Sequence, residues 1–191
     1  MKKIVMIIIV AASVFAFTTE ESKLVNKTGH MHFYSHTDVE DISADNYKVV
    51  STLNTTTGDI VVSVPMQAFE FKKALMQKHY NSPKFLDTKQ FPKAKFVGKI
   101  TNLSAVTLNV NGSYTATVSG DLTLHGVTKS ITESATLNVT DKSIGVTLGL
   151  NILLKDYNIA FEKGKPSTNI AKNVEATFTS SFTKEEVTFP Q

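Results

Sequence analysis

Three histidines in the first quarter of the chain have the residue type and spacing that could begin a metal site. His30 and His32 alternate with Met31 and Phe33, so both imidazoles lie on one face of an expected strand, and His36 follows. Three acidic residues come next: Asp38, Glu40 and Asp41. However, Met31 and Phe33 form the apolar face, so the histidines are expected to point to water. With no cysteine and no clustered carboxylates to complete a ligand set, we predict no metal site.

A second group of residues could suggest nucleophilic catalysis. Asp121 and His125 share a strand face near Ser130. All three fall at expected ladder or turn positions, which favours a structural role. The chain also lacks a Gly-x-Ser-x-Gly elbow, a His-Glu-x-x-His motif, a phosphate loop and any cysteine nucleophile. We therefore predict that the protein has no catalytic residues and no cofactor.

A lysine-rich segment is the third feature that could take part in binding. Seven lysines and one aspartate, Asp87, lie between residues 72 and 95: Lys72, Lys73, Lys78, Lys84, Lys89, Lys93 and Lys95. The simpler interpretation is a solvated face, and the alternative is a rim that attracts an anionic lipid head group or, transiently, a membrane surface. For that rim we select Lys78 and Lys84. No basic stripe accompanies the aromatic residues on the same face, so no nucleic-acid partner is predicted.

The elements that must position these residues are one-sided strands. In the segment 118–140, Val118, Leu122 and Leu124 alternate with polar residues, and a second apolar face follows His125-Gly126, interrupted only by Lys129 and Glu133. Similar alternation recurs in about eight or nine segments, which argues for an antiparallel all-β sheet that pairs with a second sheet or closes into a barrel. The pattern alone does not separate these two architectures.

One segment breaks the alternation and predicts a short helix over Phe69–Tyr80. Phe71, Leu75 and Met76 fall on one side of it, and Pro83 ends it. A helix inserted between barrel strands must lie at a barrel end, so its apolar side is expected to line the opening.

The N-terminus reads as a targeting segment. Lys2 and Lys3 precede an apolar run that is too short to span a membrane comfortably, and small residues at Val14 and Ala16 fit cleavage after Ala16. We predict a signal peptide at residues 1–16, a flexible lead at 17–27 and one domain at 28–185, in the periplasm or secreted. The alternative is an uncleaved N-terminal anchor.

Two stretches resemble the YceI-like family, lipid-binding β-barrels of the bacterial periplasm: GDLTLHGVTKSIT at 120–132 and ALMQKHYNSPKFLDTKQFPKAKFVGKI at 74–100. The resemblance runs from about Thr28 to Thr183. It implies a closed, lipocalin-like antiparallel barrel of about eight strands, with one short helix near the mouth, that binds a polyisoprenoid. Gln77-Lys78 departs from the family, since many members carry an Arg-Asp pair there.

We therefore expect non-covalent binding of a long-chain isoprenoid or similar lipid inside a barrel. The residues expected to form the cavity wall lie on the apolar faces of the strands: Phe33, Phe96, Tyr114, Leu122, Leu124, Leu148, Leu150, Ile152 and Phe178. The residues expected to line the mouth come from the helical segment and the loop after it: Phe69, Phe71, Leu75, Met76, Tyr80, Phe85 and Phe91. Two alternatives stay open, a ligand-free interaction or stress-protection module with a filled core, and an enzyme acting on an apolar substrate. The sequence leaves the oligomeric state open.

Overall fold

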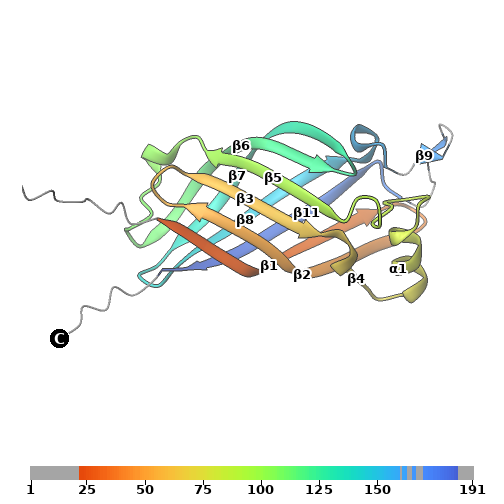
Figure 1. Cartoon of the computed structure of the whole chain (residues 1–191), viewed down its shortest axis with the longest axis horizontal. Coiled ribbons are helices and arrows are strands. Elements are labelled where there is room, and N and C mark those ends of the chain that lie inside the picture. The colour runs from red at the N-terminus through yellow and green to blue at the C-terminus, as the bar shows by residue number, and fades with distance from the viewer. Residues whose placement is uncertain (1–21, 160, 163–164, 167–169, 185–191) are drawn as a thin grey trace, which may run out of the picture.

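Eight antiparallel strands close into a barrel in the computed structural model, which describes residues 22–159, 161–162, 165–166 and 170–184 (Figure 1). Around the barrel the order is β1-β11-β8-β7-β6-β5-β3-β2, and pairing of β1 with β2 closes it. The strands are β1 (Lys23–His36), β2 (Asp41–Asn54), β3 (Asp59–Pro65), β5 (Lys93–Ile100), β6 (Gly112–Leu124), β7 (Val127–Val139), β8 (Ser143–Leu153) and β11 (Asn173–Thr183). The structure thus confirms the barrel.

The remaining elements are short and lie between the barrel strands. β4 (Glu70–Phe71) pairs with β2 on the edge that β3 also uses, and β9 (Phe161–Glu162) pairs with β10 (Lys165–Pro166). The α-helix is α1 (Ala74–Asn81), and the 3₁₀ turns are η1 (Met66–Ala68), η2 (Leu103–Ala105) and η3 (Leu154–Tyr157). Among the described residues, no helix has the length and hydropathy needed to cross a bilayer.

The helix is shorter than the sequence predicts, because a side chain holds the expected first turn in an extended conformation. The Gln77 amide donates to the Phe69 carbonyl at 2.7 Å and accepts from the Phe71 backbone N–H at 3.2 Å. Phe71 consequently belongs to β4, and α1 begins only at Ala74. The predicted end is close, since the helix ends at Asn81, two residues before Pro83.

The N-terminal boundary also differs from the prediction. Residues 23–26, expected to form part of a flexible lead, are paired with β2, with Lys23 opposite Asn54 and Leu24 opposite Leu53. Leu24 packs against the core, which gives this segment a reason to continue the strand. The predicted signal peptide and the rest of the lead lie outside the described residues.

The two ends of the barrel differ in packing. Where β1 begins and β11 ends, the interior is filled by the fully buried side chains of Leu53, Leu137, Ile144 and Phe182. Toward the other end, where Figure 1 shows α1 and β4 beside the barrel rim, inward residues such as Leu148 and Ile152 are only half-buried. The barrel therefore has a packed end and a hollow end.

Candidate ligand-binding cavity

The hollow end contains a cavity of about 1040 Å³. Its wall is mostly aliphatic and aromatic, and it draws on strands all around the barrel as well as on α1. This volume is at the top of the range found for small-molecule sites, so the interior is not wholly filled by the protein's own side chains. The filled-core alternative does not fit this barrel.

Most residues that the sequence selects meet at this cavity. Thirteen of the sixteen predicted contact residues line it: Phe33, Phe69, Phe71, Met76, Tyr80, Phe85, Phe96, Leu122, Leu124, Leu148, Leu150, Ile152 and Phe178. Lys84, one of the two predicted rim residues, lines it too. The alternation that selected these residues therefore locates the interior of the barrel correctly.

Four predicted site residues lie outside the wall of this cavity. Leu75 is 64% exposed on the outer side of α1, and Lys78 is exposed on the same helix. Phe91 packs its ring against His125, with 4.4 Å between ring centroids. Tyr114 lies toward the packed end and donates a hydrogen bond to the Val110 carbonyl at 3.0 Å. Leu75 and Lys78 both belong to α1, but their side chains face solvent, whereas Met76 and Tyr80 of the same helix line the cavity.

Aromatic rings crowd the cavity near α1. Phe33 lies 5.3 Å from Phe69 and 6.0 Å from Tyr80, and Tyr80 lies 4.9 Å from Phe71 and 6.4 Å from Phe85, between ring centroids. The Tyr80 hydroxyl is buried without a hydrogen-bond partner among the described residues. Burial raises the pKa of Tyr80 well above its usual value, so this cluster is uncharged and apolar.

Sequence reasoning missed some of the wall. Ile159 and Ile170 line the cavity from the segment between β8 and β11, where no periodicity marks an inward face. Ala94 and Ala176 are small inward residues that leave room in the wall. Glu133 also lines the cavity. It is not among the site residues predicted from the sequence, even though the alternation along β7 places it on the apolar face.

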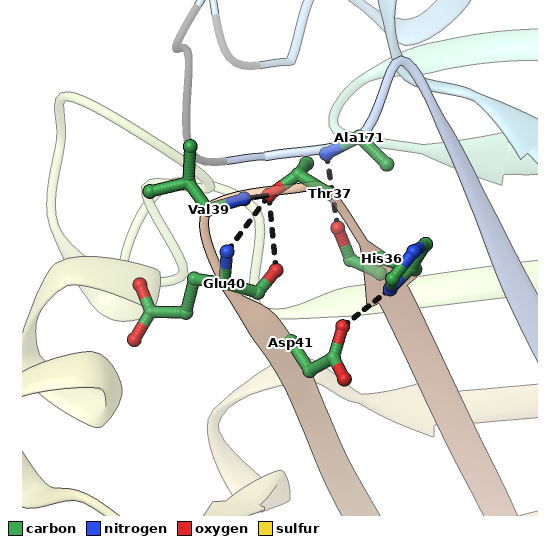
Figure 2. Close-up of polar contacts among 7 residues, drawn as sticks. His36, Thr37, Val39, Glu40, Asp41 and Ala171 are labelled. Carbon is green, nitrogen blue, oxygen red and sulfur yellow. Dashed lines mark hydrogen bonds and ion pairs between the residues drawn. The ribbon is translucent and has the colours of Figure 1, made fainter.

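The hairpin between β1 and β2 borders the cavity and is fixed by local hydrogen bonds (Figure 2). The Thr37 hydroxyl donates to the Glu40 carbonyl and accepts from the Glu40 N–H, each at 3.0 Å. The backbone N–H of Ala171 donates to the Ser35 hydroxyl at 3.0 Å, which ties the segment before β11 to β1. Ser35 is buried and lines the cavity, so this contact helps to shape the mouth.

A histidine–aspartate pair joins the two strands at the base of this hairpin. Nδ1 of His36 lies 2.5 Å from Oδ1 of Asp41 (Figure 2). This hydrogen bond raises the pKa of His36 above 6.5 and lowers the pKa of Asp41 below 3.8. The pair is on the solvent side, away from the cavity wall.

His30 and His32, which the sequence raises as possible metal ligands, lie outside the barrel. Nε2 of His30 and Nδ1 of His32 lie 2.8 Å and 2.9 Å from the same Asp45 oxygen. Partial burial of Asp45 opposes its ionisation, but the hydrogen bonds from the two histidines outweigh it and lower the pKa of Asp45. In the part of the chain that the structure describes, no group of three or more such side chains is placed to hold a metal ion.

Ser130, Asp121 and His125 do not form a catalytic triad, because His125 makes its hydrogen bond elsewhere. The Ser130 hydroxyl donates to Asp121 at 2.6 Å, whereas Nδ1 of His125 lies 3.0 Å from the Tyr157 carbonyl oxygen. His125 and Gly126 both have positive φ angles, 50° and 76°, as a two-residue hairpin turn requires. These residues are therefore occupied in structural contacts.

The barrel wall opens on one side, between β7 and β8. The two strands pair only from Ala135–Leu148 to Val139–Ile144, although β7 extends back to Val127 and β8 extends on to Leu153. A recess of about 170 Å³ lies along the unpaired edges. Nζ of Lys129 and Oδ2 of Asp156 form an ion pair of 3.2 Å at this opening.

A family model described as the YceI-like domain matches residues 15–182. The chain belongs to the YceI-like family. Its curated relatives include a UPF0312 protein of Pseudomonas syringae pv. tomato, 38% identical over 107 residues, or 53% of this chain and 50% of that protein. Another, from Pseudomonas putida W619, is 49% identical over 61 residues, which are 32% of this chain and 28% of the relative. The matches to these two relatives cover half or less of their lengths.

Solved structures agree with the YceI-like fold. A polyisoprenoid binding domain from Saccharophagus degradans superposes with a TM-score of 0.71 at 15% identity, covering 87% of this chain and all of that one. BcnA of Burkholderia cenocepacia has a TM-score of 0.67 at 16% identity, covering 82% and 96% of the two chains. At such low identity these similarities establish the YceI-like barrel and no more.

Proposed function

We propose that this YceI-like protein binds one long apolar lipid of the polyisoprenoid type, non-covalently, within its barrel. The cavity of about 1040 Å³ is the observation that carries the proposal, because its half-buried wall residues Leu148, Leu150 and Ile152 would be covered by a bound chain. The similarity to the Saccharophagus degradans domain, named for polyisoprenoid binding, supports the same choice of ligand.

The apolar chain supplies the affinity in this proposal. Each buried CH₂ group contributes about 0.8 kcal/mol, so a five-carbon isoprene unit contributes roughly 3–4 kcal/mol before the cost of ordering is subtracted. An exposed lysine–phosphate pair is worth only about 0–1 kcal/mol. Lys84 at the cavity therefore influences the choice of head group, and the chain determines whether a lipid binds at all.

We further propose a carrier rather than an enzyme, located in the cell envelope. Serine and histidine both occur in the cavity wall, but the Ser35 hydroxyl accepts the Ala171 N–H, and His79 comes from the exposed side of α1. Neither side chain is therefore arranged as an activated nucleophile with its base. The envelope location rests on the predicted signal peptide, and N-terminal sequencing of the exported protein, expected to begin at Phe17, tests it.

A native mass spectrometry titration tests binding directly. Purified, delipidated protein is mixed with geranylgeraniol, a twenty-carbon isoprenoid alcohol, or with isopentenyl alcohol as the short-chain comparison. We expect one geranylgeraniol per chain at low micromolar concentration and no retention of the five-carbon alcohol. Equal retention of the two alcohols, or retention of neither, would contradict the proposal.

A further inference from the structure

Glu133 is a charged residue on the apolar inner face of β7. It alternates with Ile131 and Ala135, which also face inward, and it lies opposite Val118 of β6, a side chain that is 3% exposed. Glu133 lines the main cavity as well as the recess between β7 and β8. A carboxylate thus lies where the strand pattern otherwise calls for an aliphatic side chain.

The other charged groups of this region already have partners. Lys129, the second charged residue on this face of β7, pairs with Asp156 at 3.2 Å. Glu40, the other carboxylate of the cavity wall, pairs with Lys73 at 3.2 Å, and Lys84 is also engaged. Within the described residues, Glu133 has no hydrogen-bond or ion-pair partner. It is the cavity carboxylate left to interact with a ligand.

The position of Glu133 is deep in the hollow half of the barrel. It lies six residues along β7 from Val127, where the strand begins beside the mouth, which corresponds to about 20 Å of extended chain. Its neighbour Ala135 begins the paired part of β7 and β8, and beyond it the interior is packed. A ligand group that reaches Glu133 is therefore the inner end of a chain that fills the cavity.

We propose that Glu133 is a polar subsite that binds a hydrogen-bond donor, a hydroxyl or an ammonium group, on the inner end of the lipid. This inference rests on the proposed function and adds to it the chemical class of that end. A carboxylate only accepts hydrogen bonds, so a hydroxyl or ammonium group satisfies it, whereas a carboxylate or phosphate at the same place is repelled.

Three probes with the same twelve-carbon chain test the subsite: dodecylamine, dodecanol and dodecanoate, each below its critical micelle concentration. Their dissociation constants are measured at neutral pH by displacement of N-phenyl-1-naphthylamine, an uncharged dye. The variants are Glu133→Gln, which keeps the shape but removes the charge, and Glu40→Gln as a control that alters the cavity carboxylate already paired with Lys73. Thermal unfolding establishes that both variants fold.

Hydrogen bonds to charged groups correspond to about tenfold or more in affinity. Relative to the unchanged protein, Glu133→Gln should raise the dissociation constant of dodecylamine about tenfold and that of dodecanol a few-fold. The dissociation constant of dodecanoate, which can enter tail first, should stay the same or fall. Glu40→Gln should leave all three constants within about twofold. Equal effects of Glu133→Gln on the three probes would overturn the subsite but leave the carrier function intact. If neither the dye nor any probe binds the unchanged protein, the carrier function fails and the subsite with it.

Discussion

Gly98 of β5 and Gly120 of β6 lie directly opposite each other, and their backbones approach so closely that neither can carry a side chain. A Cβ atom built at Gly120 would lie 2.3 Å from the Gly98 Cα and 2.3 Å from the Val97 carbonyl oxygen. At Gly98 it would lie 2.4 Å from the Ser119 carbonyl oxygen and 2.5 Å from the Phe96 ring. This glycine pair lets β5 and β6 bend around the cavity, as glycine positions do in curved sheets.

Gly120→Ala is therefore expected to destabilise the barrel. The new methyl group meets backbone atoms, which cannot rotate away, so the cost should be about 1–3 kcal/mol in the free energy of unfolding. Gly149→Ala on β8 is the matched control, since a Cβ there meets nothing within 4 Å, and its stability should be unchanged or slightly higher. Urea denaturation measures both, and equal stabilities would contradict the close approach.

Filling the cavity should remove ligand binding without unfolding the protein. Ala176 of β11 is 5% exposed and lines the cavity, so Ala176→Trp would place an indole in the space intended for lipid. Thr177→Trp adds the same group at the next position, which is exposed and outside the cavity. We expect the first variant to lose at least about tenfold in geranylgeraniol affinity and the second to bind normally. Comparable binding by both would show that this cavity is not the site.

The His36–Asp41 pair is expected to make the stability of the hairpin at the mouth depend on pH. Because the pKa of His36 is raised above 6.5, its contribution is complete below about 6.5 and is lost as pH rises through the raised value. The pKa of Asp41 is lowered below 3.8, so its contribution is complete above 3.8 and is lost as pH falls through the lowered value. His36→Gln should therefore lower Tm at pH 5 by more than at pH 9. A Tm difference that is independent of pH would contradict the pairing.

The two predicted rim lysines should differ in their effect on anionic lipids. Lys84 lines the cavity, whereas Lys78 is exposed on α1 outside it. Lys84→Gln should weaken binding of geranylgeranyl phosphate by up to about fivefold and reduce its dependence on salt, and Lys78→Gln should change neither. Isothermal titration at two salt concentrations checks this. Identical salt dependence for both variants would argue against a rim at Lys84.

The strands were predictable because their chemistry is local. Alternation along β7 and β8 identifies the inward residues, such as Leu148 and Ile152, without knowledge of the partner strands. Closure was not predictable from the pattern, since pairing of β1 with β2 joins segments whose apolar faces would equally serve a sandwich. The family resemblance supplied that choice, and the structure confirms it.

The mouth was less predictable because tertiary contacts override local pattern there. The apolar spacing of Phe71, Leu75 and Met76 indicates one helical face, but Gln77 holds Phe71 in an extended conformation and Leu75 faces solvent. Ile159 and Ile170 reach the cavity from a segment with no periodic signal. Residues placed by such contacts can be found only once the neighbouring elements are known.

The central claim is that the hollow half of this barrel holds a lipid in the cell. Its most direct test is to express the chain with residues 1–16 intact, purify the exported protein without detergent and analyse an organic extract by mass spectrometry. We predict one long apolar lipid per chain in the unchanged protein and much less in Ala176→Trp. Extracts with no lipid, or with the same lipid at the same yield from both proteins, would contradict the claim.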